Sequence, residues 1–79
     1  MYSVYILKSI STGRYYVGST QHPARRLAKH NAGHPYATKA YRRWKVVHLE
    51  EYPSRSDAIR REYEIKKMKN RSAIESLLG

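Results

Sequence analysis

The N-terminal stretch at residues 2–20 most strongly constrains the fold, because it predicts a β-hairpin. Residues 2–9 (YSVYILKS) and 14–20 (RYYVGST) are rich in the β-branched and aromatic side chains that favour strands. Residues 10–13 (ISTG) lie between them and end on Gly13, which is typical of a turn. Two adjacent strands are therefore expected at the start of the chain.

The rest of the chain predicts a third strand and three helices. Residues 44–52 (WKVVHLEEY) have strand composition, and Pro53 ends them. Residues 34–43 (HPYATKAYRR) form a polar, basic connection. The helices are expected at residues 22–33, 54–70 and 71–79, with Gly33 ending the first and Ser54 and Asp57 in a capping-box-like spacing at the start of the second. This order predicts one α/β (α+β) domain over residues 1–79, with a three-stranded antiparallel sheet flanked by helices.

Charge is the strongest global signal in the chain. Sixteen Lys and Arg residues against six Asp and Glu residues give a net charge of +10. Such an imbalance is typical of a protein with a polyanionic partner, and nucleic acid and an anionic membrane surface are the two candidates. The basic residues spread from Arg14 to Arg71 over several elements, instead of lining one helix, so nucleic acid is favoured.

Cysteine usage and the N-terminus exclude several classes of protein. The chain has no cysteine, so disulfides and thiolate metal sites are excluded, and a reducing compartment is expected. The first residues (MYSVYIL) have no basic segment followed by a long apolar stretch. Neither a signal peptide nor a membrane span is therefore expected, and the predicted location is cytoplasmic.

The helix predicted at 54–70 places a carboxylate on its apolar face. At about 100° per residue, Glu62 falls inside the apolar arc and Glu64 falls on the far side. The apolar residues that define this arc are Ala58, Ile59 and Ile65. An inward-facing carboxylate is costly unless it is paired or binds a cation. Two interpretations stay open: Glu62 binds a metal, or it forms an ion pair with Lys66 or with an arginine of the first helix.

The helix predicted at 22–33 presents a similar mixed face. Its expected buried residues are Ala24, Leu27 and Ala28. Arg26 and His30 are four residues apart and flank that face, which makes them candidates for a site at the edge of the core. Arg25 and Lys29 point away, toward solvent or a phosphate backbone. The alternative is that Arg26 is a surface residue whose aliphatic stem covers the core.

Other site chemistries are weakly supported by the sequence. The histidines, which could suggest zinc, are His22, His30, His34 and His48. Gly33 should end the helix between His30 and His34, and no fourth ligand is obvious, so a zinc site is not favoured. Most strand or helix tyrosines serve packing, and this interpretation is kept for Tyr15, Tyr52 and Tyr63.

One ordered set of residues resembles a known family. Tyr5 ends Ser3-Val4-Tyr5, and Tyr16 begins Tyr16-Val17-Gly18. Downstream, in order, follow Arg26, His30 and, after the third strand, Glu62. This order resembles the GIY-YIG nuclease family, in particular its small single-domain members, and covers nearly the whole chain. Ser3 stands where the family consensus has glycine.

The resemblance implies a GIY-YIG-like fold and a metal-dependent endonuclease that hydrolyses DNA phosphodiester bonds. Glu62 would hold Mg²⁺ or Mn²⁺, and Arg26 would bind the scissile phosphate. Tyr5 would act as the general base beside the attacking water. Tyr16 and His30 would orient phosphate or water, or assist proton transfer. A phenol has an ordinary pKa of about 10, so a nearby cation would have to lower it for this role.

The expected partner is DNA, with branched, damaged or single-stranded forms as candidates. The family's nucleases with defined targets usually carry a separate DNA-binding domain, and its absence from this sequence predicts weak sequence specificity. The residues expected to contact nucleic acid are Arg25, Lys29, Lys39, Arg42, Arg43 and Lys66. The alternative function is a catalytically weak or inactive nucleic-acid-binding module of a larger DNA repair or processing complex.

We expect the affinity for DNA or RNA to fall steeply as salt rises. The reason is the net charge of +10, which releases condensed counterions when it meets phosphates. Fluorescence anisotropy of a labelled oligonucleotide over a series of salt concentrations measures this dependence. A flat dependence would contradict the electrostatic account.

Overall fold

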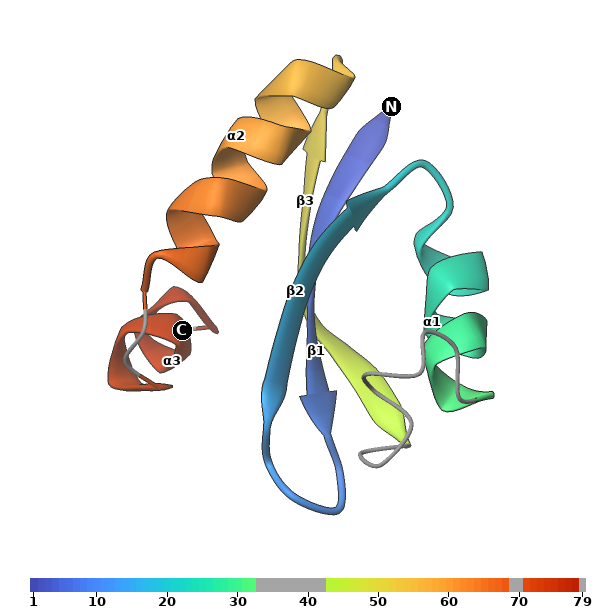
Figure 1. Cartoon of the computed structure of the whole chain (residues 1–79), viewed down its shortest axis with the longest axis vertical. Coiled ribbons are helices and arrows are strands. Elements are labelled where there is room, and N and C mark those ends of the chain that lie inside the picture. The colour runs from blue at the N-terminus through green and yellow to red at the C-terminus, as the bar shows by residue number, and fades with distance from the viewer. Residues whose placement is uncertain (33–42, 69–70, 79) are drawn as a thin grey trace.

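The computed structural model describes residues 1–32, 43–68 and 71–78. Three strands, β1 (Tyr2–Ser9), β2 (Tyr15–Thr20) and β3 (Trp44–Tyr52), form one antiparallel sheet in the order β2-β1-β3. The helices are α1 (Pro23–Asn31), α2 (Arg55–Lys66) and α3 (Arg71–Leu78). Figure 1 shows α2 and α3 on one side of the sheet and α1 on the other. The predicted three-stranded antiparallel sheet flanked by helices is confirmed.

Strand β1 is central and is buried on both of its faces. Alternate side chains of a strand point to opposite faces of the sheet, so β1 supplies two different cores. Val4 and Ile6 are fully buried on the α2 side, whereas Tyr5 and Leu7 are buried on the α1 side. The apolar residues of β1 therefore form a continuous run, instead of alternating with polar residues as in a strand with one buried face.

The larger core lies between the sheet and the two C-terminal helices. Its buried residues are Val4, Ile6, Val17, Ala58 and Ile65. Partly buried residues of all three strands and of α3 pack against them: Tyr2, Tyr15, Val47, Tyr52, Ile74, Leu77 and Leu78. The packing role expected for Tyr15 and Tyr52 is thus observed, whereas the one expected for Tyr63 is wrong because this residue is 62% exposed. This core fixes the position of α2 on the sheet.

The smaller core lies between the sheet and α1, and aromatic side chains dominate it. Its buried residues are Tyr5, Leu7 and Trp44, with Tyr16 and Leu27 packed against them. Asn31 at the end of α1 makes two hydrogen bonds to Trp44: its Oδ1 accepts from the backbone N at 2.6 Å, and its Nδ2 donates to the backbone O at 3.2 Å. This pair ties α1 to the first residue of β3.

The inward face of α1 differs from the one expected. Ala24 and Ala28 are exposed, so their predicted burial is wrong. His30 is the buried residue of the helix, and Arg26 and Leu27 are half-buried. The spacing 26, 27 and 30 makes one helical stripe, and two of its three members are polar. Small alanines gain little from burial, so the stripe that meets the aromatic core is the one with the larger side chains.

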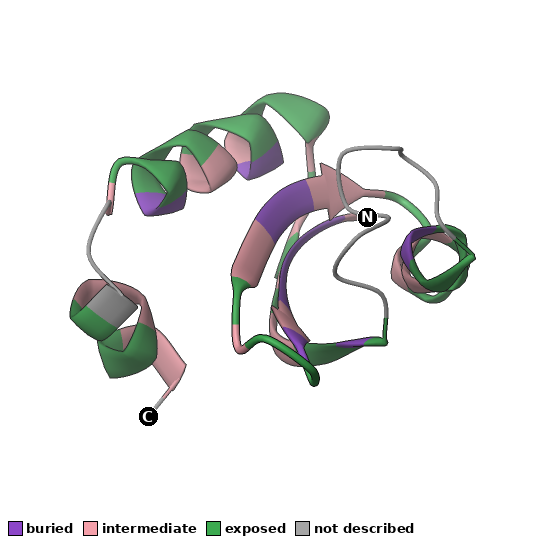
Figure 2. Cartoon of the chain, turned by 60° about the horizontal axis from the view of Figure 1, so that its bottom comes forward, coloured by how far each residue is buried: buried purple, intermediate pink, exposed green. Residues whose placement is uncertain are grey.

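Helix α2 is shorter than the stretch predicted for it. The Ser54 hydroxyl accepts a hydrogen bond from the backbone N of Asp57 at 3.2 Å, which confirms the expected cap. The helix ends at Lys66, and residues 69 and 70 lie outside the described part of the chain. Figure 2 shows its buried positions facing the sheet and its exposed positions facing outward. Ala58 and Ile65 are buried as expected, whereas Ile59 is exposed.

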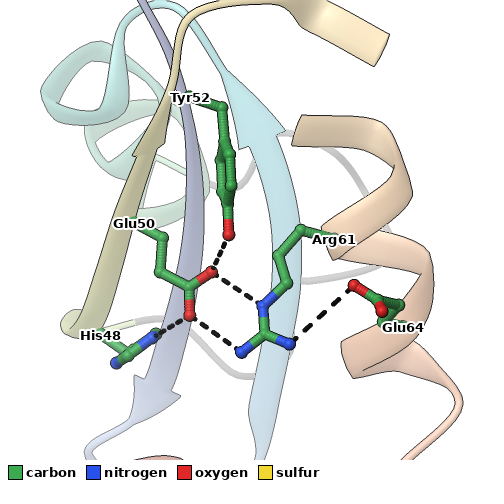
Figure 3. A network of polar contacts seen from close by, with 5 residues as sticks. All are labelled: His48, Glu50, Tyr52, Arg61 and Glu64. Atoms are coloured by element: carbon green, nitrogen blue, oxygen red, sulfur yellow. Dashed lines mark hydrogen bonds and ion pairs between the residues drawn. The ribbon is translucent and has the colours of Figure 1, made fainter. Parts of the chain in front are cut away.

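A polar network fastens α2 to the edge strand β3 (Figure 3). The Glu50 carboxylate accepts hydrogen bonds from Arg61 at 2.8 and 3.1 Å and from the Tyr52 hydroxyl at 2.6 Å, and it lies 2.7 Å from His48 Nε2. The hydrogen bonds from Arg61, aided by those from His48 and Tyr52, lower the pKa of Glu50 to about 2, although burial opposes the shift. Glu50 therefore stays ionised at neutral pH and serves as an anchor for α2.

Glu50→Gln should lower the free energy of unfolding by about 1–2 kcal/mol at pH 7, because the amide keeps the shape and loses the charge. The folded-state pKa of about 2 lies below the ordinary 4.5, so this stabilisation is present above 4.5 and is lost as the pH falls toward 2. Urea denaturation at several pH values measures the difference. The control is Glu64→Gln, because the Glu64 side chain is 58% exposed and its contact with Arg61 is long, at 4.0 Å. Equal effects of the two variants would contradict the anchoring role.

Candidate active site

Three aromatic side chains from three elements meet on the α1 side of the sheet. The Tyr5 hydroxyl on β1 lies 3.5 Å from Nε2 of His30 on α1. Tyr16 on β2 lies beside both, with ring centroids 6.4 Å from Tyr5 and 4.5 Å from His30. Trp44 completes the cluster, with its ring centroid 6.3 Å from that of Tyr16. The sequence-predicted residues Tyr5, Tyr16 and His30 are thus brought together.

Gly18 is needed because the Tyr5 ring lies directly against its backbone. The two residues are register partners in the β1–β2 ladder. A Cβ atom at Gly18 would lie 2.5 Å from the Tyr5 hydroxyl oxygen and 2.7 Å from Cζ. Any side chain at this position would therefore displace the phenol from its place next to His30. This contact gives the glycine of the Tyr16-Val17-Gly18 tripeptide a steric reason.

Burial and nearby charges keep the side chains of Tyr5 and His30 in their neutral forms. Burial, reinforced by Tyr16 and Glu62, raises the pKa of Tyr5 to about 12, although the Arg26 guanidinium pulls it down. Burial, and then the like charge of Arg26, lower the pKa of His30 below its ordinary 6.5. At neutral pH the phenol therefore carries its proton and the imidazole carries no charge.

Glu62 lies on α2, on the other side of the sheet from His30, and its charge acts on Tyr5. Its Oε1 accepts a hydrogen bond of 2.6 Å from the Ser19 hydroxyl, and its Oε2 lies 2.6 Å from Lys66 Nζ. Its side chain is only 19% exposed, as expected for the apolar arc of the helix. The i,i+4 ion pair with Lys66, one of the two open interpretations, is observed. Within the described part of the chain, no arginine of α1 pairs with Glu62.

A cleft of about 340 Å³ opens beside the aromatic centre, where the end of β2 meets the starts of α1 and α2. Its lining residues are Tyr2, Ser19, Thr20, Gln21, His22, Arg26 and Arg55. Ser19 links the cleft to Glu62, and Arg26 links it to Tyr5 through its electrostatic effect on the phenol. The cleft is therefore lined by two guanidinium groups, and a carboxylate and a phenol are connected to it through Ser19 and Arg26.

Sequence reasoning did not find Ser19, Asn31 or Arg55. Ser19 could have been found from strand alternation, because it shares the face of Val17 and so points toward α2. The Asn31–Trp44 contact and the place of Arg55 join segments that are distant in the chain, and no local pattern indicates them.

Four of the six residues expected to contact nucleic acid lie in the described part of the chain, and all four are exposed. Arg25 and Lys29 are exposed on the outer side of α1, and Arg43 is exposed before β3 with a φ of 71°. Lys66 is 51% exposed and is paired with Glu62. Lys39 and Arg42 lie outside the described residues.

Two exclusions hold for the part of the chain that the structure describes. No group of three or more His, Cys, Asp or Glu side chains is placed to hold a metal ion, so a zinc site gains no support there. His34, one of the residues considered for zinc, lies outside that part. None of the described helices is long and apolar enough to cross a membrane.

Comparison with known proteins identifies relatives along almost the whole chain. Residues 1–75 match the GIY-YIG catalytic domain. A UPF0213 protein of Halobacterium salinarum is 41% identical over 69 residues, which cover 86% of this chain and 88% of that relative. A UPF0213 protein of Bacillus halodurans, solved by NMR, has a TM-score of 0.61 at 34% identity and covers 99% of this chain, which spans 83% of it.

A second group of relatives consists of larger proteins. The structure-specific endonuclease subunit SLX1 of Debaryomyces hansenii is 37% identical over 70 residues, which are 78% of this chain and 20% of that protein. The SLX1 of Candida dubliniensis is 44% identical over 72 residues and matches over 25% of its length. The chain therefore corresponds to one part of these proteins.

We expect Arg26→Gln to raise the pKa of His30, because the variant removes a like charge that disfavours the imidazolium. Arg25→Gln removes the same charge from the exposed side of α1 and should leave His30 unchanged. NMR titration of the imidazole resonances between about pH 4 and 8 measures both variants. An equal response to the two substitutions would contradict the orientation of Arg26 toward the centre.

Proposed function

Because the chain belongs to the GIY-YIG family, we propose that it is an endonuclease that hydrolyses DNA phosphodiester bonds with weak sequence specificity. The resemblance inferred from the two tyrosine tripeptides agrees with the match over residues 1–75. One observation carries the proposal most directly: the Tyr5 hydroxyl lies 3.5 Å from His30 Nε2, and the charges of Arg26 on α1 and Glu62 on α2 both act on the pKa of this phenol. Phosphodiester hydrolysis needs such a combination of a phosphate-binding cation, a carboxylate and a proton-transfer group.

Glu62 fits a divalent cation of the Mg²⁺ or Mn²⁺ type. Mg²⁺ is commonly held by one or two carboxylates, with waters and substrate phosphate oxygens as the other ligands. Glu62 is a single carboxylate beside the cleft, and Oε2 already attracts a cation, the exposed ammonium of Lys66. When bound, a divalent cation would neutralise phosphate charge and lower the pKa of a coordinated water. Ser19 would keep the carboxylate oriented by its hydrogen bond to Oε1.

Arg26 is suited to bind the scissile phosphate. A guanidinium donates two parallel hydrogen bonds that match a pair of phosphate oxygens. Within the described part of the chain, no carboxylate lies at ion-pair distance from Arg26, so its donors are available to a substrate. Its half-buried position beside His30 holds it at the opening of the cleft.

Tyr5 and His30 can form a proton-transfer pair. With a pKa of about 12, Tyr5 is a hydrogen-bond donor until added positive charge favours its phenolate. His30 is neutral at pH 7, and with Nε2 unprotonated the ring can accept the phenol proton across 3.5 Å. Tyr5 could then take a proton from the attacking water. Tyr16, on the edge strand β2, packs against both side chains and helps to hold them in place.

The substrate proposed is DNA, with branched, damaged or single-stranded forms to be compared. The net charge of +10 favours a polyanion, and the exposed Arg25, Lys29 and Arg43 lie where a backbone can contact them. Relatives named as structure-specific endonuclease subunits support the inclusion of branched DNA in the comparison. Labelled duplex, single-stranded, flap and four-way substrates, each with Mg²⁺, Mn²⁺ or chelator, test the activity and its preference.

Glu62→Gln should reduce metal-dependent cleavage by at least about 100-fold, because the amide keeps the size and loses the charge that a hard cation requires. DNA binding should be unchanged or tighter, because one repulsive charge near phosphate is removed. Glu64→Gln is the matched control, since Glu64 lies on the same helix and its side chain is 58% exposed. Cleavage by Glu62→Gln at the wild-type rate would refute the assignment. Binding without cleavage by the wild-type protein on every substrate would favour the alternative of an inactive binding module.

A further inference from the structure

The cleft of about 340 Å³ extends beyond the residues assigned to the reaction. Its far side is formed by Arg55, the first residue of α2, together with Tyr2 and the segment from Thr20 to His22. Among the residues that the structure describes, no carboxylate lines it. Its volume falls at the small end of the range for ligand-binding clefts, about 300–1,000 Å³, so it can admit a group larger than a single ion.

Arg26 and Arg55 give this cleft two positive charges that no carboxylate of the described residues pairs with. Within the described ranges, neither guanidinium has a carboxylate at ion-pair distance. Arg61, in contrast, is held by Glu50. Two like charges that share a cleft repel each other, and an anion that contacts both relieves this repulsion.

We propose that the cleft is a second phosphate subsite, in which Arg55 binds the backbone phosphate next to the one held by Arg26. This inference rests on the proposed function, because it places the scissile phosphate on Arg26. A nucleic acid strand offers a regular row of phosphates, so two guanidinium groups in one cleft suit neighbouring phosphates of one strand. Ser19 joins this cleft to Glu62, so the strand would pass the carboxylate as it runs from Arg26 to Arg55.

The subsite gives a role to a residue outside the reacting groups. Arg55 would contact the substrate and orient the strand, without touching the scissile phosphate. Its removal should therefore weaken substrate binding and leave the maximal cleavage rate close to that of the wild type, since uniform binding affects KM and not kcat. Arg55→Lys should restore part of the affinity, because it keeps the charge and loses the two-pronged geometry.

The first experiment measures binding of a labelled single-stranded oligonucleotide by fluorescence anisotropy, in chelator and at several salt concentrations. Arg55→Gln should weaken binding by about 5- to 10-fold and reduce the salt slope by about 0.7, the loss expected for one phosphate contact. Arg60→Gln is the matched control, because Arg60 lies on the same helix, is exposed and does not line the cleft. Thermal melts of both variants confirm that folding is retained. Equal effects of the two variants would overturn the proposal.

The second experiment locates the phosphate. In an oligonucleotide with a mapped cleavage position, each phosphate beside the scissile one is replaced in turn by an uncharged methylphosphonate. One replacement should weaken binding to the wild-type protein and add nothing in Arg55→Gln, because the two changes remove the same contact. Additive losses at every position would overturn the subsite. If no DNA is cleaved, the proposed function fails; the same replacements made along the whole oligonucleotide, read by binding, still test Arg55.

Discussion

The burial of strand β1 on both faces is the constraint on which the rest of the structure depends. Val4 and Ile6 commit one face to the core beneath α2 and α3, and Tyr5 and Leu7 commit the other to the smaller core beneath α1. Because alternation along a strand is fixed, the hydrophobic core and the aromatic centre are attached to the same backbone. Tyr5 is therefore held as rigidly as the residues of the core on either side of it.

The two faces of the sheet pack against different kinds of side chain. On the α2 side, aliphatic packing and the Glu50–Arg61 network hold the helix that carries Glu62. On the α1 side, the inward stripe of the helix contains an arginine and a buried histidine, which contribute less to burial than apolar residues would. The Asn31–Trp44 hydrogen bonds offset part of this loss by joining the end of α1 to β3. Four of the five predicted site residues thus lie on the α1 side of the sheet, whereas Glu62 is carried by α2 on the other side.

The charges around Tyr5 suit the proposed function, in which an anionic substrate and a cation bind together. Without them, burial and Glu62 raise the pKa of the phenol, and Arg26 only partly opposes this. A cation on Glu62 would cancel the carboxylate's effect and add its own, so both changes would favour the phenolate. In the proposed mechanism, the protonation state of Tyr5 therefore depends on whether the substrate and the cation are bound, and Tyr5 stays a neutral phenol until they are.

The sequence by itself determined the hairpin, the third strand, the capped helix at Ser54 and the order of Tyr5, Tyr16, Arg26, His30 and Glu62, because periodicity and motif spacing are local properties of the chain. The structure brings Tyr5, Tyr16 and His30 together, and the charges of Arg26 and Glu62 act on Tyr5. The catalytic roles of all five residues stay predictions. Only the tertiary structure decided which stripe of α1 is buried: the expectation for Ala24 and Ala28 was wrong because the aromatic cluster opposite the helix selects Arg26, Leu27 and His30. Likewise, Ser19 on Glu62, Asn31 on Trp44 and Arg55 in the cleft are contacts between segments far apart in the chain, and such contacts are set by how the elements pack and not by any local pattern.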